Sequence, residues 1–152
     1  MSRFFTPTLA ALTPYTPGEP RAVADRGKRH ANDHPSPPAP GVAPAVAGTV
    51  AGLRLYSDLR QTKLTEAIAR RCGVPASWVL CGNGSDENLL LAIRAFCDGG
   101  TPLAFADITY SFYPVLCDLL GVPKRVVPLR GDFTLDPADY RGLGAAIVIA
   151  NP

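Results

Sequence analysis

Short apolar segments that alternate with helical segments constrain the fold of this chain more than any other feature. Four segments have the length and apolar character of strands, and they cover residues 78–81, 102–106, 125–129 and 145–150. The last is apolar throughout, as is typical of a strand buried on both faces. Strands joined by helices run parallel, because a crossover returns the chain to the same end of the sheet. The sequence therefore predicts an α/β fold with a partial, mostly parallel sheet.

Three helices are predicted, over residues 62–72, 85–96 and 111–120. The first is amphipathic and is followed by Gly73, a typical stop signal. The second has little polar surface, so we expect it to be largely buried. The third has Pro114 in its first turn, where a missing N–H costs nothing. Asp136-Pro137 predicts the start of a short fourth helix.

Prolines dominate the N-terminal part of the chain. Nine of the sixteen prolines lie in the first 44 residues, where neither helical nor strand periodicity persists. We therefore expect an extended, Pro-rich arm or linker over residues 1–50 and an α/β domain over residues 51–152. The chain stops directly after its last predicted strand, at the sheet edge where open α/β sheets bind ligands. For this reason we expect the domain to be incomplete and the chain to be truncated.

Composition excludes several classes of protein. The chain of 152 residues is the length of one ordinary domain, and no apolar run approaches the ~20 residues of a membrane span. A formal net charge of +2 gives no reason to expect nucleic acid as a partner. The first residues lack the pattern of a secretory signal, so the expected compartment is the cytoplasm. Four cysteines without metal-ligand spacing predict buried thiols and no metal site.

The most informative motif is Cys-Gly-Asn-Gly-Ser-Asp-Glu at 81–87, between a predicted strand and a predicted helix. Its two glycines permit a tight turn, after which the first N–H groups of the helix, near Gly84, Ser85 and Asp86, are free to bind an anion. The motif therefore predicts a phosphate-binding loop. A capped helix without a ligand is the alternative. A Rossmann loop does not fit, because its third glycine would fall on Glu87, and no Walker sequence occurs.

A second motif, Thr-Tyr-Ser-Phe-Tyr-Pro at 109–114, follows the next predicted strand. It is therefore expected at the same edge of the sheet as the phosphate-binding loop. An aromatic side chain at that edge can lie flat over a planar ligand, and simple core packing is the alternative. Together the two motifs suit a small, planar, phosphorylated cofactor.

Four motifs in order carry a resemblance to a known family. They are Leu-Tyr-Ser-Asp at 55–58, Gly-Asn-Gly-Ser-Asp-Glu at 82–87, Asp-Ile-Thr-Tyr-Ser-Phe-Tyr-Pro at 107–114 and Ile-Ala-Asn-Pro at 149–152. In this order they resemble the histidinol-phosphate aminotransferases, which are pyridoxal-phosphate enzymes of fold type I. Residues 12–19 are similar to the N-terminal arm of that family. The resemblance covers nearly the whole chain and about the first two-fifths of a typical family member.

The resemblance implies pyridoxal 5'-phosphate as the cofactor. It assigns Gly84, Ser85 and Asp86 to the cofactor phosphate and Tyr110 to stacking on the pyridine ring. It also implies that Tyr56 reaches across a homodimer to the phosphate of the neighbouring subunit.

For the substrate, the resemblance implies small-molecule amino donors and acceptors. The family transfers an amino group between L-histidinol phosphate and 2-oxoglutarate in histidine biosynthesis. Tyr15 matches an arm tyrosine that contacts substrate, and Asn32 matches the first position of the family's Asn-Glu-(Asn/Ser)-Pro motif.

The resemblance breaks at the catalytic lysine. A transaminase needs a lysine that forms a Schiff base with the cofactor, and this chain has only Lys28, Lys63 and Lys124. None lies in the family's Ser-Lys context, so we expect no catalytic residue here and no activity from the chain alone. One alternative is a non-catalytic binding or dimerisation module derived from an aminotransferase. The other is part of an aromatic-amino-acid transaminase.

Overall fold

The computed structural model describes residues 4–13 and 36–151. The chain divides into two compact units at the Cys81–Gly82 bond, and each is described by itself. One unit contains residues 36–81, and the other contains residues 82–151 with the described N-terminal residues. The expected domain boundary between residues 50 and 51 stays a prediction.

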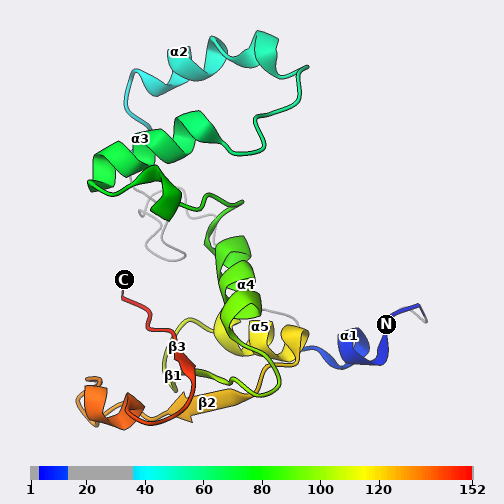
Figure 1. The fold of residues 1–152 in the computed structure, drawn as a ribbon, viewed down its shortest axis with the longest axis vertical. Coiled ribbons are helices and arrows are strands. Elements are labelled where there is room, and N and C mark those ends of the chain that lie inside the picture. The colour runs from blue at the N-terminus through cyan, green and yellow to red at the C-terminus, as the bar shows by residue number, and fades with distance from the viewer. Residues whose placement is uncertain (1–3, 14–35, 152) are drawn as a thin grey trace, which may run out of the picture. The chain divides into compact units, whose positions relative to one another are not determined.

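A three-stranded parallel sheet organises the unit that begins at Gly82. Its strands are β1 (Leu103–Ala106), β2 (Lys124–Val127) and β3 (Ala146–Ile147). β1 lies between the other two strands and pairs in parallel with both (Figure 1). This arrangement confirms the predicted α/β fold with a small parallel sheet.

The helices of this unit are α4 (Ser85–Phe96), α5 (Phe112–Leu120) and the short 3-10 helix η3 (Pro137–Tyr140). α5 is the crossover from β1 to β2, and it ends at Gly121, whose φ of 67° is the left-handed conformation that glycine adopts readily. η3 begins where Asp136 accepts the N–H of Ala138, as Asp-Pro predicted.

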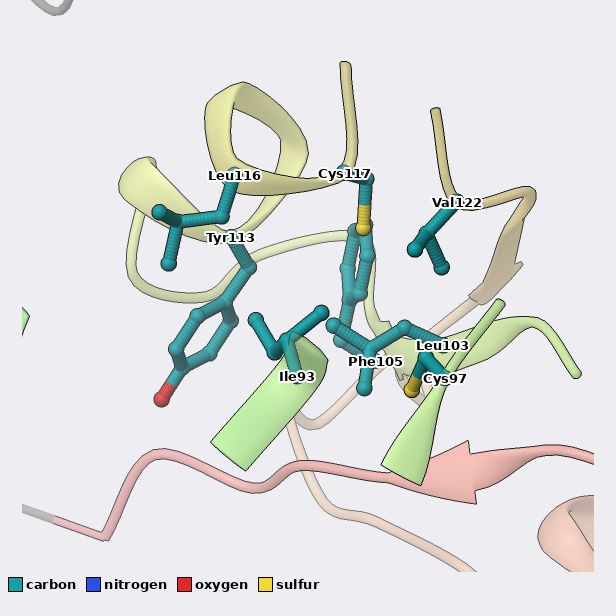
Figure 2. Packing of buried hydrophobic residues seen from close by; sticks show 8 residues of the cluster. All are labelled: Ile93, Cys97, Leu103, Phe105, Tyr113, Leu116, Cys117 and Val122. Carbon is teal, nitrogen blue, oxygen red and sulfur yellow. The ribbon is translucent and has the colours of Figure 1, made fainter. Parts of the chain in front are cut away.

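β1 is buried along its whole length, and its two faces contact different layers. Leu103 and Phe105 point into a cluster with side chains of α4 and α5, including Ile93 and Leu116 (Figure 2). The intervening Ala104 belongs to a second, smaller cluster with Tyr140 of η3. Successive side chains of a strand point to opposite faces, so a run of four apolar residues is needed to fill both layers.

The unit of residues 36–81 is helical. It contains α2 (Val42–Ala47), the 3-10 turn η1 (Val50–Gly52), α3 (Thr62–Cys72) and the 3-10 turn η2 (Ala76–Trp78). α3 has the predicted bounds and ends at Gly73 with φ of 68°. η2 packs against α3.

The strand predicted at 78–81 is wrong. Pro75 instead opens η2, in which the N–H of Trp78 donates to the carbonyl of Pro75 at 2.9 Å and that of Val79 to the carbonyl of Ala76. Trp78 and Leu80 are 77% and 70% exposed, so this apolar run has no sheet to join among the described residues.

The predictions that the helix at 85–96 is largely buried and that the strand at 145–150 is buried on both faces are wrong. In α4 only Ile93 is buried, whereas Phe96 is 75% exposed. The predicted strand at 145–150 shortens to the two residues of β3, and Ile147 is 47% exposed. β3 pairs only with β1 in the described sheet, which leaves its other edge and much of its surface uncovered.

The extended N-terminal arm is not shown by the structure. Where that arm was expected, the described residues contain α1 (Pro7–Ala11) and α2. Thr6 caps α1 by accepting the N–H of Leu9, and Pro7 occupies the first turn, so this proline favours the helix instead of breaking it. In the described parts of the chain, no helix combines the length and the apolar character required to cross a membrane.

Leu116 and Leu119 provide a matched test of the core on one helix. Leu116 of α5 is 1% exposed, whereas Leu119 is 42% exposed. Leu116→Ala should lower the free energy of unfolding by about 2–5 kcal/mol, because it removes buried surface and leaves a cavity. Leu119→Ala should change it by less than about 1 kcal/mol. Urea unfolding followed by circular dichroism measures both, and equal effects would contradict this description of the core.

Candidate functional site

The carboxyl edge of the sheet is the candidate site. After β1 the chain crosses to β2 on one side, and β3 then pairs on the other side, which makes this edge a topological switch point. Open α/β sheets bind their ligands at such points. A cavity of about 150 Å³ lies at this edge, and the segments that follow all three strands line it. Its lining residues are Ala106, Ile108, Thr109, Leu129, Phe133, Leu135, Val148, Ile149 and Ala150.

Asp107 fixes the start of the loop that leaves β1. One of its carboxylate oxygens, Oδ1, accepts the N–H of Ile108 at 2.9 Å and that of Leu129 at 3.0 Å. Its own N–H donates to the carbonyl of Val127 at 3.0 Å. The loop that carries Tyr110 is thereby tied to the segment after β2. The sequence motifs do not mark Asp107 as a site residue, although an acidic residue directly after a buried strand is a signal for such a role.

The N-terminus of α4 offers free hydrogen-bond donors. Gly84 is the N-cap, with φ of 86°, and no side chain among the described residues caps the helix there. The first N–H groups of a helix have no partner within the helix, and the helix dipole favours a negative charge beside them. Ser85 and Asp86 occupy the first two positions of α4. Their N–H groups fit the phosphate-binding loop that the motif predicted.

One hydrogen bond joins the two predicted motifs. The hydroxyl of Tyr110 donates to Oδ1 of Asp86 at 2.9 Å, across 24 residues of sequence. Tyr110 is partly buried, and its ring meets that of Tyr113 edge-on, with ring centroids 5.5 Å apart. The ring is therefore held at its edge by Tyr113 and at its tip by Asp86. The strand-end aromatic and the start of α4 lie together, as the sequence predicted.

The carboxylate of Glu87 folds back onto the loop before the helix. Its Oε2 accepts the N–H of Asn83 at 2.5 Å. In a capping box, a glutamate three residues after the N-cap accepts the N–H of the N-cap itself, and here the acceptor reaches one residue further back. This role of Glu87 is not among the predictions from sequence, although the spacing from Gly84 to Glu87 is that of a capping box.

Gly82 is required by close packing. A Cβ at this position would collide with Oδ1 of Asn88 and would lie 3.0 Å from Oε2 of Glu87. The amide oxygen of Asn88 is buried and has no hydrogen-bond partner among the described residues. The loop before α4 therefore lies directly on the side chains of Glu87 and Asn88, where the first turn of the helix passes into the second.

Tyr56 lies in the other unit and is fully exposed. The segment that carries it ends at Asp58, whose two carboxylate oxygens accept the N–H groups of Arg60 at 3.0 Å and Thr62 at 2.9 Å. Hydrogen bonds from the hydroxyl and N–H of Thr62, with that from Arg60, lower the pKa of Asp58 from 3.8 to about 2. Asp58 thus fixes the segment of Tyr56 to the start of α3.

The structure brings together four of the predicted site residues, which are Gly84, Ser85, Asp86 and Tyr110. Tyr15 and Asn32, the predicted substrate contacts, lie outside the described residues.

Comparison with known proteins identifies a matching family. The profile of the family "Aminotransferase class I and II" matches residues 26–151. The chain belongs to this aminotransferase family. Over all 152 residues it is 46% identical to histidinol-phosphate aminotransferase 1 of Bradyrhizobium diazoefficiens, of which it covers 43%. It is 44% identical to histidinol-phosphate aminotransferase 1 of Bordetella parapertussis, of which it covers 44%. The aminotransferase chain thus spans less than half the length of these relatives.

Solved aminotransferase structures have the same fold. The histidinol-phosphate aminotransferase of Sinorhizobium meliloti, in complex with pyridoxal-5'-phosphate, superposes with a TM-score of 0.71 at 25% sequence identity. The match covers 87% of this chain and 37% of that one. The small parallel sheet is therefore part of the fold type I aminotransferase architecture.

Gly82→Ala tests the packing of the loop against α4. The added methyl group must displace Asn88 or Glu87, so we expect a loss of about 1–3 kcal/mol in the free energy of unfolding. Gly99→Ala is the matched control, since a Cβ there meets no atom within 4 Å and the φ of Gly99 is not left-handed. Urea unfolding compares the two variants. An equal effect of both substitutions would contradict the close approach at Gly82.

Thr62→Ala tests the anchoring of Asp58. A carboxylate whose folded pKa is depressed stabilises the fold above its ordinary pKa of 3.8, and this contribution is lost as the pH falls toward about 2. Removing the Thr62 hydroxyl should raise the pKa of Asp58 toward 3.8, as measured from the carboxyl carbon shift by NMR. Thr65→Ala is the control, because its hydroxyl donates to the carbonyls of Gln61 and Thr62 instead. An unchanged pKa in Thr62→Ala would refute the assignment.

Proposed function

We propose that this chain forms the phosphate-binding and ring-stacking side of a pyridoxal-phosphate site in an aminotransferase that acts on L-histidinol phosphate and 2-oxoglutarate. The observation that carries the proposal is the 46% identity, over the whole chain, with an enzyme named histidinol-phosphate aminotransferase 1. The geometry supports it independently, because the hydrogen bond between Tyr110 and Asp86 gathers both cofactor motifs at one edge of the sheet. When bound, pyridoxal phosphate supplies the electron sink that transamination requires.

Backbone groups are the proposed phosphate ligands. The N–H groups of Gly84, Ser85 and Asp86 stand at the uncapped start of α4, where the helix dipole favours an anion. The side chain of Asp86 has a different role in this proposal, since a carboxylate and a phosphate repel one another. It accepts the Tyr110 hydroxyl and so orients the aromatic ring that would stack on the pyridine ring.

The catalytic lysine is proposed to lie outside these 152 residues. Within residues 82–151 the only lysine is Lys124. It begins β2, so it stands at the opposite end of the strand from the candidate site, and its Nζ pairs with Asp118 at 2.6 Å. Lys63 belongs to the other unit, where it is exposed on α3.

We also propose a homodimer, small-molecule amino donors and acceptors as substrates, and the cytoplasm as the compartment. The full exposure of Tyr56 suits a residue that completes the phosphate site of a second subunit in a homodimer. Tyr15 and Asn32 are proposed to contact substrate. All four cysteines are free thiols, which suits the reducing cytoplasm.

Titration of the 152-residue chain with pyridoxal phosphate tests the cofactor assignment. We expect reversible binding that weakens by about threefold to tenfold in Tyr110→Ala, because aromatic stacking contributes about 0.5–1.5 kcal/mol. Borohydride treatment followed by mass spectrometry should show no stoichiometric attachment to a lysine. A stoichiometric lysine adduct would refute the proposed location of the catalytic lysine, and an absence of binding would refute the half-site.

A chimaera tests the substrate. Residues 1–152 replace the matching 43% of the Bradyrhizobium diazoefficiens relative, and transamination of L-histidinol phosphate is assayed with 2-oxoglutarate as acceptor. We expect activity on L-histidinol phosphate and a much lower rate with aromatic amino acids. The reverse preference would assign the chain to an aromatic-amino-acid transaminase.

A further inference from the structure

We infer that Glu87 is a positioning residue for the phosphate-binding loop, and that it shapes the loop without touching the phosphate. The inference rests on the proposed function, since it concerns how the same site is held. It begins from an electrostatic conflict. Asp86 and Glu87 place two carboxylates in the first turn of α4, beside the N–H groups proposed to bind a phosphate dianion. Each carboxylate would repel a bound phosphate, so a hydrogen-bond donor from the protein is needed to offset its negative charge.

The structure gives each carboxylate a different hydrogen-bond donor. Asp86 accepts the Tyr110 hydroxyl, as described above, and Glu87 accepts the N–H of Asn83. The contact from Glu87 connects the third residue of α4 back to Asn83 in the loop before the helix. The N–H of Asn83 is thereby committed to a protein acceptor, whereas those of Ser85 and Asp86 remain at the uncapped helix start.

The loop needs such a restraint because of its composition. Gly82-Asn83-Gly84 contains two glycines, and glycine loses more conformational freedom on folding than any other residue. Gly84 also adopts φ of 86°, a backbone conformation that glycine reaches readily and other residues rarely adopt. Glu87 and Asn88 contact the loop closely at Gly82, so the side chains of the helix act as the surface on which the loop is formed.

Loss of positioning and loss of charge predict opposite changes in phosphate affinity when Glu87 is replaced by alanine. The same substitution therefore distinguishes the two effects. Glu87→Ala removes a negative charge near the proposed phosphate, and that effect alone would tighten anion binding. If Glu87 positions the loop, the variant loses the contact to Asn83 and binds the phosphate more weakly. Glu87→Gln keeps an oxygen acceptor and removes only the charge, so it should bind at least as well as the unmodified chain.

The experiment compares dissociation constants for pyridoxal phosphate and for pyridoxal, which lacks the phosphate group. In Glu87→Ala we expect about tenfold weaker binding of pyridoxal phosphate, the factor typical of losing a charge-assisted hydrogen bond. Binding of pyridoxal should be unchanged. Amide hydrogen exchange at Asn83 should be faster in Glu87→Ala and restored in Glu87→Gln. Arg94→Ala, an exposed residue in the last turn of α4, is the control and should alter neither measurement.

The possible outcomes separate a failure of the cofactor site from a failure of the role of Glu87. If the unmodified chain binds no pyridoxal phosphate, the proposed function fails and this inference fails with it. If the unmodified chain binds and Glu87→Ala binds equally well or more tightly, the site stands and the positioning role of Glu87 is refuted. Equal weakening of pyridoxal and pyridoxal phosphate also refutes it, because a general loss of folding would affect both ligands.

Discussion

Burial of β1 on both faces is the constraint on which the α/β unit of residues 82–151 depends. Leu103 and Phe105 supply the layer toward α4 and α5, and Ala104 supplies the layer toward η3. Fully burying a large apolar side chain contributes about 1.5–3 kcal/mol, so this one strand carries a large share of a small core. Its two neighbours depend on it, because β2 and β3 each pair with β1 and not with one another.

The candidate site inherits its geometry from that strand. Asp107 follows β1 at the sheet edge, and its hydrogen bond to the N–H of Leu129 fixes the loop after β1. In that loop, the hydroxyl of Tyr110 donates to Asp86. The start of α4 is thus connected to the sheet by hydrogen bonds between named side chains and backbone groups. A site for a rigid, planar, phosphorylated cofactor requires such fixed distances between a stacking ring and a set of N–H donors.

The sequence predicted most elements that have strong local signals. α3 and α4 have the predicted bounds, and Gly73, Pro114 and Asp136 act as the stop and start signals that their residue types indicate. Predictions that depended on burial were less accurate. Apolar character alone led to the predictions of a strand at 78–81 and of a largely buried α4. Burial of an apolar side chain, however, also requires a partner surface that packs against it. Trp78 and Phe96 have none among the described residues and are exposed.

For the site residues too, local signals could be predicted from sequence, and contacts that depend on packing could not. The phosphate-binding loop and Tyr110 could be located from sequence, because glycine spacing and strand ends have a local physical meaning. The contact that joins them could not, since residues 86 and 110 are related only through the packing of α4, β1 and α5. Glu87 does have a local signal, because it stands three residues after the N-cap Gly84, as in a capping box.

The bond between Tyr110 and Asp86 also limits how this chain can vary over evolution. Replacing the tyrosine with phenylalanine keeps the ring but leaves a carboxylate beside an anion-binding helix start without its donor. Replacing Asp86 with an apolar residue leaves the partly buried hydroxyl without this acceptor. Either single change is unfavourable, whereas a paired change to phenylalanine and a small neutral residue keeps the ring and removes the charge. Positions 86 and 110 should therefore covary among homologous sequences, even though 24 residues separate them.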